Sequence, residues 1–257
     1  MIWIVLPAYN EAANIGGLLQ EICLTWQETL PHRSIRVLVV DDGSADGTGD
    51  VVERFRDELS ADVFPGCAIE LLRHEQNQGL AEAIRSGLSA AAQRAGDRDI
   101  ILTMDADNSH VPGLIPSMVR VIAEGYDVVI ASRYQRGARV VGLSQHRRAL
   151  SFVASFLFRG LFPIPNVRDY TCGFRAYRAG LIREVFEENP QFISERGFSC
   201  MVDILLKLRT RQPSVTMAEV PLLLRYDKKE GASKMNVGAT ITDTLALIAR
   251  RRMGIED

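Results

Sequence analysis

The stretch Asp99-Ile-Ile-Leu-Thr-Met-Asp-Ala-Asp107 has the pattern of an apolar strand that ends in two carboxylates. Asp105 and Asp107 cannot both be core groups, because burying an unpaired carboxylate costs several kcal/mol or forces it to take up a proton. At a strand end they suit a divalent cation, since magnesium and manganese accept oxygen ligands and leave positions open for phosphate oxygens. A solvated acidic turn is the alternative for this pair alone. The stretch therefore predicts a buried strand with a candidate metal site at its end.

Strand and helix patterns alternate on both sides of this stretch. Short apolar runs predict strands over residues 2–6, 35–40, 69–73, 99–104 and 127–132. Apolar residues at helical spacing predict helices over residues 11–30, 47–59, 79–95 and 112–124. This alternation is typical of an α/β protein with a doubly wound, mainly parallel sheet flanked by helices. In the less regular second half we expect a mobile loop over 133–148, helices over 149–161, 180–188 and 197–210, a strand over 215–220 and a closing helix over 237–253.

The composition excludes several classes of protein. With 257 residues, 47% hydrophobic and 24% charged, the chain suits one large domain with or without a C-terminal extension. Its net charge of −2 argues against a nucleic-acid partner held by bulk electrostatics. The four cysteines are scattered without a C-x-x-C pair, which indicates reduced thiols of a cytosolic protein rather than a disulfide framework or a zinc site.

The sequence shows neither a secretory signal nor a membrane span. Its apolar start is interrupted at Pro7, too early for a signal peptide. No segment reaches the roughly 18–20 apolar residues that cross a bilayer. The nearest is Ala149–Phe158, which ends at Arg159. We expect it to form a buried helix or a helix that lies at a membrane surface.

Three polar clusters follow three of the predicted strands. They are Pro7–Glu11, Asp41–Ser44 and Asp105–Asp107. The carboxyl ends of parallel strands meet at one edge of a sheet, and ligands of such sheets bind beyond that edge. The joint placement of the clusters therefore predicts a single ligand site.

The clusters also carry a family resemblance. PAYNE at 7–11, DDGSADGT at 41–48, the N-x-G-L-x-x-A pattern at 77–83 and MDADNSH at 104–110 resemble the motifs of family 2 glycosyltransferases of the GT-A fold. Ser132-Arg-Tyr134, the stretch 169–178 and Gly231–Met235 are similar to the polyprenyl-phosphate branch, typified by dolichyl-phosphate mannose synthase. The resemblance covers residues 1–235 and implies a nucleotide-binding half over 1–132 and an acceptor-binding half over 133–235. Beyond it, the apolar and basic pattern predicts a C-terminal amphipathic helix over 236–257.

The resemblance implies roles for residues of the first two clusters. Pro7, Tyr9 and Glu11 would line the nucleotide base and ribose. Asp41 and Asp42 would accept hydrogen bonds from the base or the ribose. Gly79 would let the backbone approach the nucleotide. From the residues alone, Asp42-Gly43 also suits a plain turn, and Gly79 also suits the start of a helix.

In the third cluster the resemblance implies that Asp105 and Asp107 bind Mg²⁺ or Mn²⁺, which bridges the donor diphosphate. Ser109 would add a ligand or orient one, whereas His110 is expected to be a structural turn residue.

A phosphate acceptor is already anionic and needs no strong base once it is positioned. The barrier then lies in the charge of the leaving group, which the metal and basic side chains stabilise.

The second half supplies the expected basic groups. They are Arg133, Arg147, Arg148, Arg175, Lys228 and Lys234. Arg147 and Ser151 match an R-x-x-x-S element that is implied to grip a lipid phosphate, a task that suits the guanidinium fork. Asp169 is the best candidate base for an acceptor hydroxyl, with a turn cap as its alternative role.

Two stretches depart from the pattern of mannose synthases. Asp227-Lys228 stands where that branch has Asp-Arg, and Gly197–Asp203 departs from its G-Y-x-F-Q-x-E stretch. Lysine cannot form the planar fork of arginine. These changes indicate a divergent branch of the family and do not determine which sugar is transferred.

The sequence thus predicts a metal-dependent, inverting glycosyltransferase. It would move a hexose from GDP-mannose, or next from UDP-glucose, to a polyprenyl or dolichyl phosphate. We expect a cytoplasmic protein, peripheral to the inner face of the membrane. It would dock through helices 149–161 and 237–253 or through a separate membrane-protein partner. A sugar-hydroxyl acceptor, a nucleotidyltransferase and a non-catalytic nucleotide-sugar sensor are the alternatives.

Overall fold

The computed structural model describes residues 1–59, 64–142, 145–197, 199–211, 214–228, 246 and 248–250, and of 145–151 and 154 it describes the backbone only. The strands are β1 Ile2–Ala8, β2 Ile35–Asp41, β3 Cys67–Arg73, β4 Ile100–Thr103, β5 Val128–Ser132, β6 Arg139–Val141, β7 Arg175–Arg178, β8 Met217–Pro221 and β9 Leu223–Arg225. The helices are α1 Ala12–Thr29, α2 Thr48–Glu58, α3 Leu80–Arg94, α4 Ile115–Ala123, α5 Gln145–Leu161, α6 Ala179–Glu188 and α7 Ser199–Arg209, with 3₁₀ turns η1 Pro112–Leu114 and η2 Tyr226–Lys228.

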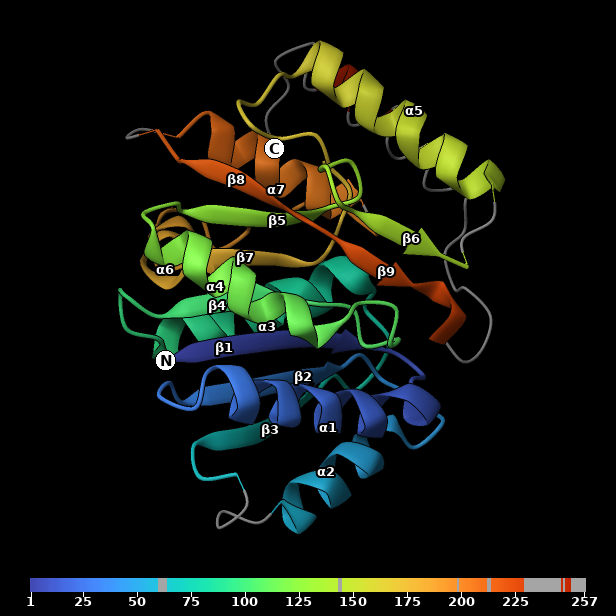
Figure 1. Ribbon diagram of the computed structural model, residues 1–257, viewed down its shortest axis with the longest axis vertical. Helices are drawn as coiled ribbons and strands as arrows, with labels where there is room; N and C mark the ends of the chain where they lie inside the picture. Colours follow the sequence, from blue (N-terminus) through green and yellow to red (C-terminus); the bar gives the residue numbers. More distant parts are fainter. Residues whose placement is uncertain are drawn as a thin grey trace.

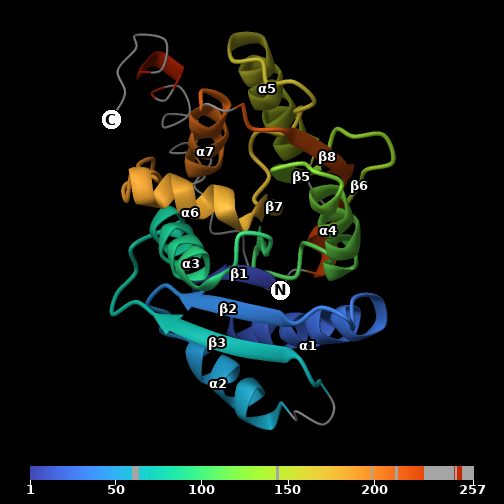
Figure 2. The same cartoon turned by 90° about the vertical axis from the view of Figure 1, so that its left-hand side faces the viewer.

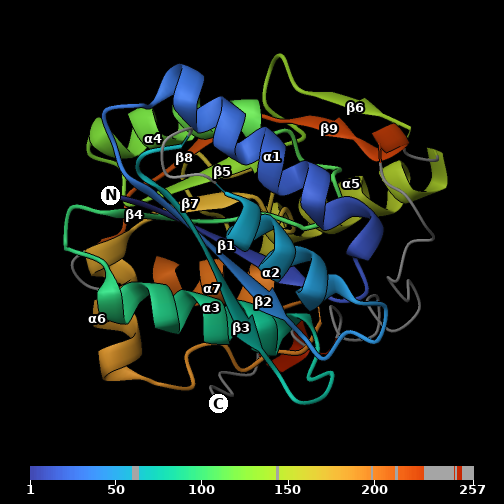
Figure 3. The same ribbon diagram turned by 90° about the horizontal axis from the view of Figure 1, so that it is seen from below.

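A mainly parallel sheet forms the centre of the molecule (Figure 1). Its seven strands run in the order β3-β2-β1-β4-β7-β5-β8, and β7 alone is antiparallel to its neighbours. β1 and β2 are almost entirely buried, as expected for parallel strands covered on both faces. α1 and α4 cover one face, and α3 and α6 cover the other (Figures 2 and 3). The predicted α/β fold and the strand and helix alternation of the first half are confirmed.

The second half departs from the sequence-based prediction in two places. The segment 133–148, expected to be a mobile loop, contains β6 and the start of α5, and β6 pairs with β9. β7 was not predicted, because its sequence Arg-Ala-Tyr-Arg is short and carries two arginines. It nevertheless lies between β4 and β5, with Ala176 and Tyr177 fully buried.

Helix α5 lies at the outer end of the molecule, away from β1, β2 and β3 (Figure 1). It exposes Phe152, Val153, Phe156 and Leu157, which are 59%, 53%, 65% and 40% exposed. Among the described residues, none of the helices combines the length and apolarity that a membrane span requires. The predicted closing helix over 237–253 and the C-terminal segment 236–257 lie outside the described residues, except for 246 and 248–250.

Candidate active site

The three polar clusters lie at the same edge of the sheet. β1 pairs in parallel with β2, so that Ala8 stands beside Asp41, and with β4, so that Val5 stands beside Thr103. The three strands therefore point the same way, and the segments that follow them leave the sheet together. The register places the clusters as the sequence predicted.

Hydrogen bonds tie the first cluster to the second. The backbone N–H of Asn10 donates to Ser44 Oγ at 2.9 Å, and the N–H of Ala45 donates to Asn10 Oδ1 at 2.9 Å. The N–H of Glu11 donates to Thr48 Oγ1 at 2.8 Å. Asn10 has a left-handed φ of 52°, which asparagine tolerates better than most residues. The loops after β1 and β2 thus form one braced unit.

Within that unit, Tyr9 and Glu11 differ in exposure. Tyr9 is 38% exposed, so part of its ring faces solvent at this edge. Glu11 is 7% exposed, and its Oε2 accepts a hydrogen bond from Asn14 Nδ2 at 2.7 Å. The backbone carbonyl of Asn14 accepts a bond from Asn108 Nδ2 at 3.2 Å, which links α1 to the third cluster. Tyr9 is thus accessible from solvent at this edge, whereas Glu11 holds the surrounding segments together through its hydrogen bond to Asn14.

The Asp42 carboxylate is occupied by hydrogen bonds to other residues of the protein. Its carboxylate accepts the backbone N–H groups of Gln78 at 2.9 Å and Gly79 at 2.7 Å, and it pairs with His74 Nδ1 at 2.7 Å. His74 Nε2 in turn lies 3.0 Å from Ser86 Oγ on α3. This differs from the expectation that Asp42 bonds the base or ribose directly. In the structure it positions the loop before α3, and His74 is a positioning residue that the sequence motifs did not reveal.

Two glycines in these loops adopt conformations that other residues rarely adopt, and Gly43 also allows a close backbone approach. Gly43 has a φ of 69°, and a Cβ at this position would lie 2.5 Å from the backbone carbon of Gln76. Any larger residue would therefore push the second cluster away from the loop before α3. Gly79 has a φ of 92°, but a Cβ there would meet no atom of the described residues within 4 Å. At Gly79 it is the left-handed conformation that favours glycine, rather than a close contact with another part of the described chain.

Asp105 and Asp107 are both half-buried on either side of the buried Ala106, so neither is a core group. Asp107 is oriented by Ser109, whose Oγ and backbone N–H donate to Asp107 Oδ1 at 2.6 and 3.1 Å. Ser109 itself is 2% exposed. Of the two roles expected for Ser109, the structure favours the orientation of Asp107.

His110 shapes the turn that holds Asp105. The backbone N–H of Asp105 donates to His110 Nδ1 at 3.3 Å, so this nitrogen acts as an acceptor. The His110 ring is 4% exposed and lies 5.2 Å from the ring of Phe174. A Cβ on Gly173 would lie 3.1 Å from Asp105 Oδ1, so glycine lets that segment pass close to the carboxylate. This geometry agrees with the expected structural role of His110.

Two aspartates are hard oxygen donors, as magnesium and manganese require. Within the described part of the chain, no group of three or more His, Cys, Asp or Glu side chains is arranged to hold a metal ion. Asp105 and Asp107 leave most positions of an octahedral ion to other oxygens, such as those of a diphosphate. The residues present fit the expected divalent ion, with Ser109 as a support.

Asp169 is buried completely and paired with Arg133. Its carboxylate accepts hydrogen bonds from Arg133 Nε at 2.8 Å, Nη2 at 2.6 Å and the backbone N–H at 3.0 Å, and from the N–H of Cys172 at 3.1 Å. Burial alone would raise the pKa of Asp169, but the Arg133 charge and these bonds outweigh it and lower the pKa. A carboxylate that is inaccessible and holds its charge strongly is a poor base. The predicted base role of Asp169 is corrected to a positioning role, and Arg133 is its partner.

Arg175 was expected to bind the acceptor phosphate, and this prediction is wrong. The side chain is 0% exposed. Its guanidinium donates to three backbone carbonyls, those of Cys172 at 2.9 Å, Met201 at 2.6 Å and Tyr170 at 2.8 Å. Arg175 therefore joins β7 to α7 and to the segment that carries Asp169, and it does not reach a ligand.

The other expected phosphate-binding residues are less fully described. Lys228 is exposed, and its Nζ lies 3.7 Å from Glu21 Oε2 on α1. The side chains of Arg147, Arg148 and Ser151, and the whole of Lys234, lie outside the described residues. Arg147 and Ser151 belong to α5 by their backbone, so they lie one helical turn apart.

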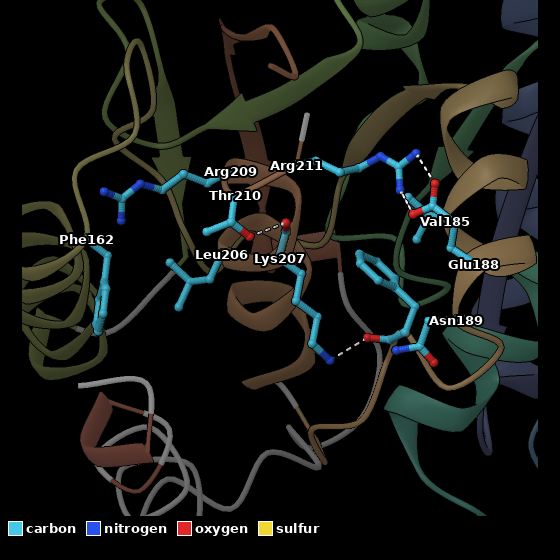
Figure 4. Close-up of a pocket in the computed structure, with 10 residues that line it drawn as sticks. Phe162, Val185, Glu188, Asn189, Leu206, Lys207, Arg209, Thr210 and Arg211 are labelled. Carbon is cyan, nitrogen blue, oxygen red and sulfur yellow. Dashed lines mark hydrogen bonds and ion pairs between the residues drawn. The ribbon is translucent and has the colours of Figure 1, made fainter. Parts of the chain in front are cut away.

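A cavity of about 510 Å³ lies elsewhere, between α6 and α7 (Figure 4). Phe162, Phe192 and Lys207 are among the residues that line it. Lys207 Nζ donates to the carbonyl of Phe192 at 2.6 Å, and Arg211 is paired with Glu188. None of the predicted site residues lines this cavity, so we place the candidate active site at the carboxyl edge of the sheet.

The fold is that of GT-A glycosyltransferases. Glucosyl-3-phosphoglycerate synthase from Mycobacterium tuberculosis, crystallised with Mn²⁺ and UDP, aligns with a TM-score of 0.64 and 22% identity over 100% of this chain and 81% of that chain. Mannosyl-3-phosphoglycerate synthase from Rubrobacter xylanophilus aligns with a TM-score of 0.65 and 21% identity over 100% of this chain and 76% of that chain.

The chain belongs to the glycosyl transferase family 2, whose model matches residues 3–186. It is 30% identical to an undecaprenyl-phosphate mannosyltransferase of Micrococcus luteus over 91% of this chain and 87% of the relative. It is also 30% identical to a dolichol-phosphate mannosyltransferase of Pyrococcus furiosus, over 96% of this chain but 62% of the relative. A polyprenol monophosphomannose synthase of Mycolicibacterium smegmatis is 29% identical over 96% of this chain and 84% of the relative. The predicted family resemblance and the assignment as a glycosyltransferase are confirmed.

Proposed function

We propose that the protein transfers a hexose from a nucleotide sugar to a polyprenyl phosphate, with inversion at the sugar carbon. The names of the three relatives support a lipid-phosphate acceptor. The observation that carries the proposal is the burial of Asp169 in its pair with Arg133. A hydroxyl acceptor needs a base, whereas a phosphate is already a nucleophile, and the carboxylate expected to serve as base is not accessible.

The donor would bind across the braced loops at the edge of the sheet. Tyr9 would offer its ring to the base, and Asp41 would accept hydrogen bonds from base or ribose. The space beside Gly79 would admit the ribose and diphosphate. We propose GDP-mannose as the donor because the relatives are named as mannosyltransferases or a mannose synthase, with UDP-glucose as the next candidate.

Asp105 and Asp107 would hold a magnesium or manganese ion, which supplies positive charge to the leaving diphosphate. One neighbour of the same fold, glucosyl-3-phosphoglycerate synthase from Mycobacterium tuberculosis, was crystallised with Mn²⁺ and also with Mg²⁺, which supports a divalent ion. Ser109 keeps Asp107 in place through its hydroxyl. The acceptor phosphate would be held by Arg147 and Ser151 on α5, with Lys228 and Lys234, and would attack the sugar from the side opposite the leaving group.

A transfer assay tests this function. A radiolabelled nucleotide sugar is incubated with a short-chain prenyl phosphate, or with the same prenol lacking phosphate. We expect transfer to the phosphate alone. Asp107→Asn should lower kcat at least about 100-fold without a change in melting temperature beyond about 2 °C. Asp57→Asn, an exposed residue on α2, is the matched control. Full turnover by Asp107→Asn or by chelated enzyme would refute the metal role, and transfer to the prenol would refute the phosphate acceptor.

A thermal-shift panel identifies the donor. A ligand at about 100 times its dissociation constant stabilises the native state by about 2.7 kcal/mol. For a chain of this size that raises the melting temperature by roughly 5–10 °C. We expect this shift with GDP-mannose and manganese, and a smaller one with UDP-glucose. The reverse order would assign a glucosyl donor.

We further propose that α5 docks on the membrane that holds the acceptor. Phe152, Val153, Phe156 and Leu157 form a continuous apolar face on this helix, which we call the α5 face. Amphipathic helices of this kind insert their apolar face between lipid headgroups. A membrane-protein partner that covers the α5 face is the alternative occupant.

Vesicle flotation tests the docking. Phe156→Asp should reduce binding to vesicles of phosphatidylcholine and phosphatidylglycerol about 10-fold or more, because a buried phenylalanine contributes about 1.5–3 kcal/mol. Leu24→Asp is the matched control, since Leu24 is 42% exposed on α1 and lies off the α5 face. Equal flotation of both variants and of the wild type would refute the membrane contact.

A further inference from the structure

Two of the four cysteines meet in the fold although they are 44 residues apart in the sequence. Cys23 lies on α1, and Cys67 is the first residue of β3. Their Sγ atoms are 3.0 Å apart and form a hydrogen-bonded contact. Cys172 and Cys200 are buried in other parts of the molecule. The sequence pattern, which lacks a C-x-x-C pair, gave no sign of this contact.

The packing around the two sulfur atoms is tight. Cys67 shares its face of β3 with Arg73, because side chains alternate along a strand, and Arg73 pairs with Asp50 on α2. This is the face on which α1 and α2 lie. A Cβ added to Gly66 would lie 3.2 Å from the ring of Trp26 on α1, so the end of α1 is packed against the start of β3. The contact between the sulfur atoms is therefore set by two regular elements.

We propose that Cys23 and Cys67 are a modification site that closes to an intramolecular disulfide when it meets a small disulfide oxidant such as glutathione disulfide. The Cys67 thiolate attacks one sulfur of the oxidant and releases one glutathione thiolate. Cys23 then attacks Cys67 Sγ and releases the second glutathione thiolate. The two protons of the cysteines pass to the released thiolates, so two cysteine thiols are oxidised and one glutathione disulfide is reduced to two thiols.

The order of these steps follows from exposure. Cys67 is partly exposed on β3, which is the edge strand of the sheet, whereas Cys23 is fully buried. The oxidant can therefore reach Cys67, and Cys23 reacts only from inside the molecule. The hydrogen bond from Cys23 also lowers the pKa of Cys67, and the same contact raises the pKa of Cys23. The accessible thiol is the one that more readily becomes the nucleophile.

The position of the pair determines the consequence. Cys67 begins β3, whereas the candidate active site lies beyond the carboxyl ends of the parallel strands. The disulfide would close a loop that contains β2 and α2, and a closed loop restricts the unfolded chain. We therefore expect oxidation to stabilise the nucleotide-binding half and to leave sugar transfer unchanged.

The experiment compares protein treated with glutathione disulfide and protein treated with dithiothreitol. Free thiols are alkylated after unfolding, and the digested peptides are mapped by mass spectrometry. We expect a linked peptide pair containing Cys23 and Cys67, with Cys172 and Cys200 alkylated as internal controls. The melting temperature of the oxidised wild type should rise by about 5 °C or more. Cys67→Ala should show no such rise, and the rate of transfer should be equal in both redox states of the wild type.

Two results would overturn the proposal. One is glutathione retained on Cys67 with Cys23 still a free thiol, which would mean that the buried sulfur does not resolve the mixed disulfide. The other is a wild type in which both thiols remain reduced although Cys67 is alkylated in the folded protein. The peptide map of the wild type decides the matter even where a variant folds poorly. A failure of the proposed glycosyl transfer would leave this result intact, because the map does not depend on activity.

Discussion

Replacing Asp169 by asparagine separates the two roles considered for this residue. Asparagine has nearly the same shape but no charge, so Arg133 would keep its position with no counter-charge. Its amide nitrogen would face donors where a carboxylate oxygen now accepts hydrogen bonds, among them the backbone N–H of Thr171 at 3.3 Å and of Cys172 at 3.1 Å. We therefore expect Asp169→Asn to act on stability before it acts on chemistry.

The magnitude follows from burial. Asp169 is 0% exposed and the Arg133 side chain is 15% exposed, so solvent screens the pair weakly. Removing one partner of a buried, hydrogen-bonded ion pair costs about 3–5 kcal/mol. A chain of this size loses about 2–4 °C of melting temperature per kcal/mol, so the melting temperature should fall by about 6–20 °C. Asp57→Asn, which breaks an exposed pair with Arg56, should cost no more than about 1 kcal/mol.

The pH dependence supplies a second readout. The pKa of Asp169 is lowered in the folded protein, so its contribution to stability is present above the ordinary aspartate pKa and is lost as the pH falls through the lower, folded-state pKa. The difference in unfolding free energy between wild type and Asp169→Asn should be constant from pH 8 to about 5 and should narrow below about pH 4. Urea unfolding at a series of pH values measures it.

The reasoning fails if Asp169→Asn unfolds like the wild type but is inactive, because that result describes an accessible base. The double variant Arg133→Met/Asp169→Asn provides a further check, since it removes the uncompensated charge. We expect it to be more stable than Asp169→Asn alone. A double variant whose loss equals the sum of the two single losses would show that the two side chains do not interact.

Three further predictions concern side chains that position other groups, two in the loops at the carboxyl edge and one, Arg175, on β7. Ser109→Ala removes the hydroxyl that orients Asp107, so kcat and manganese affinity should fall about 10- to 100-fold, as activity titrations with manganese would show. His74→Ala releases Asp42 from one contact, so the donor KM should rise about 10-fold with little change in kcat, and His74→Asn should recover part of it; an unchanged KM would contradict the positioning role. Arg175→Met leaves three buried carbonyls without their donor and should cost at least about 3 kcal/mol in urea unfolding, without changing the KM of the lipid phosphate in the folded fraction.

The fold of the first half could be predicted because each of its strands is a local signal. β2, for example, is a run of seven residues buried almost throughout, and the parallel topology follows from the helices between such runs. β7 gave no such signal. Its arginines suggest a surface segment, and its place between β4 and β5 depends on pairings with strands that are distant in the sequence.

The same distinction explains which site residues could be predicted. Asp105 and Asp107 could be picked out from the sequence as candidate metal ligands, because carboxylates that directly follow an apolar strand have few other roles. Arg175 was misassigned because a sequence shows that an arginine is present but not what its guanidinium meets. In the structure it meets main-chain carbonyls contributed by the segment before β7 and by α7. The contact of His74 with Asp42 is equally non-local, since 32 residues separate them.

The ion pair at Asp169 also connects the site edge to the α5 face. The Arg133 guanidinium lies 5.6 Å from the centre of the Tyr134 ring, and that ring meets Phe152 edge-on at 6.1 Å. Phe152 belongs to the face that we propose for membrane contact. A chain of direct contacts therefore runs from a fully buried carboxylate to an exposed side chain of the α5 face. Because Arg133 takes its position from Asp169, the loss of that carboxylate should disturb both the candidate active site at the sheet edge and the helix that we propose for membrane docking. Weaker vesicle binding by Asp169→Asn, measured below its melting temperature, would show that the two are coupled through Arg133 and Tyr134.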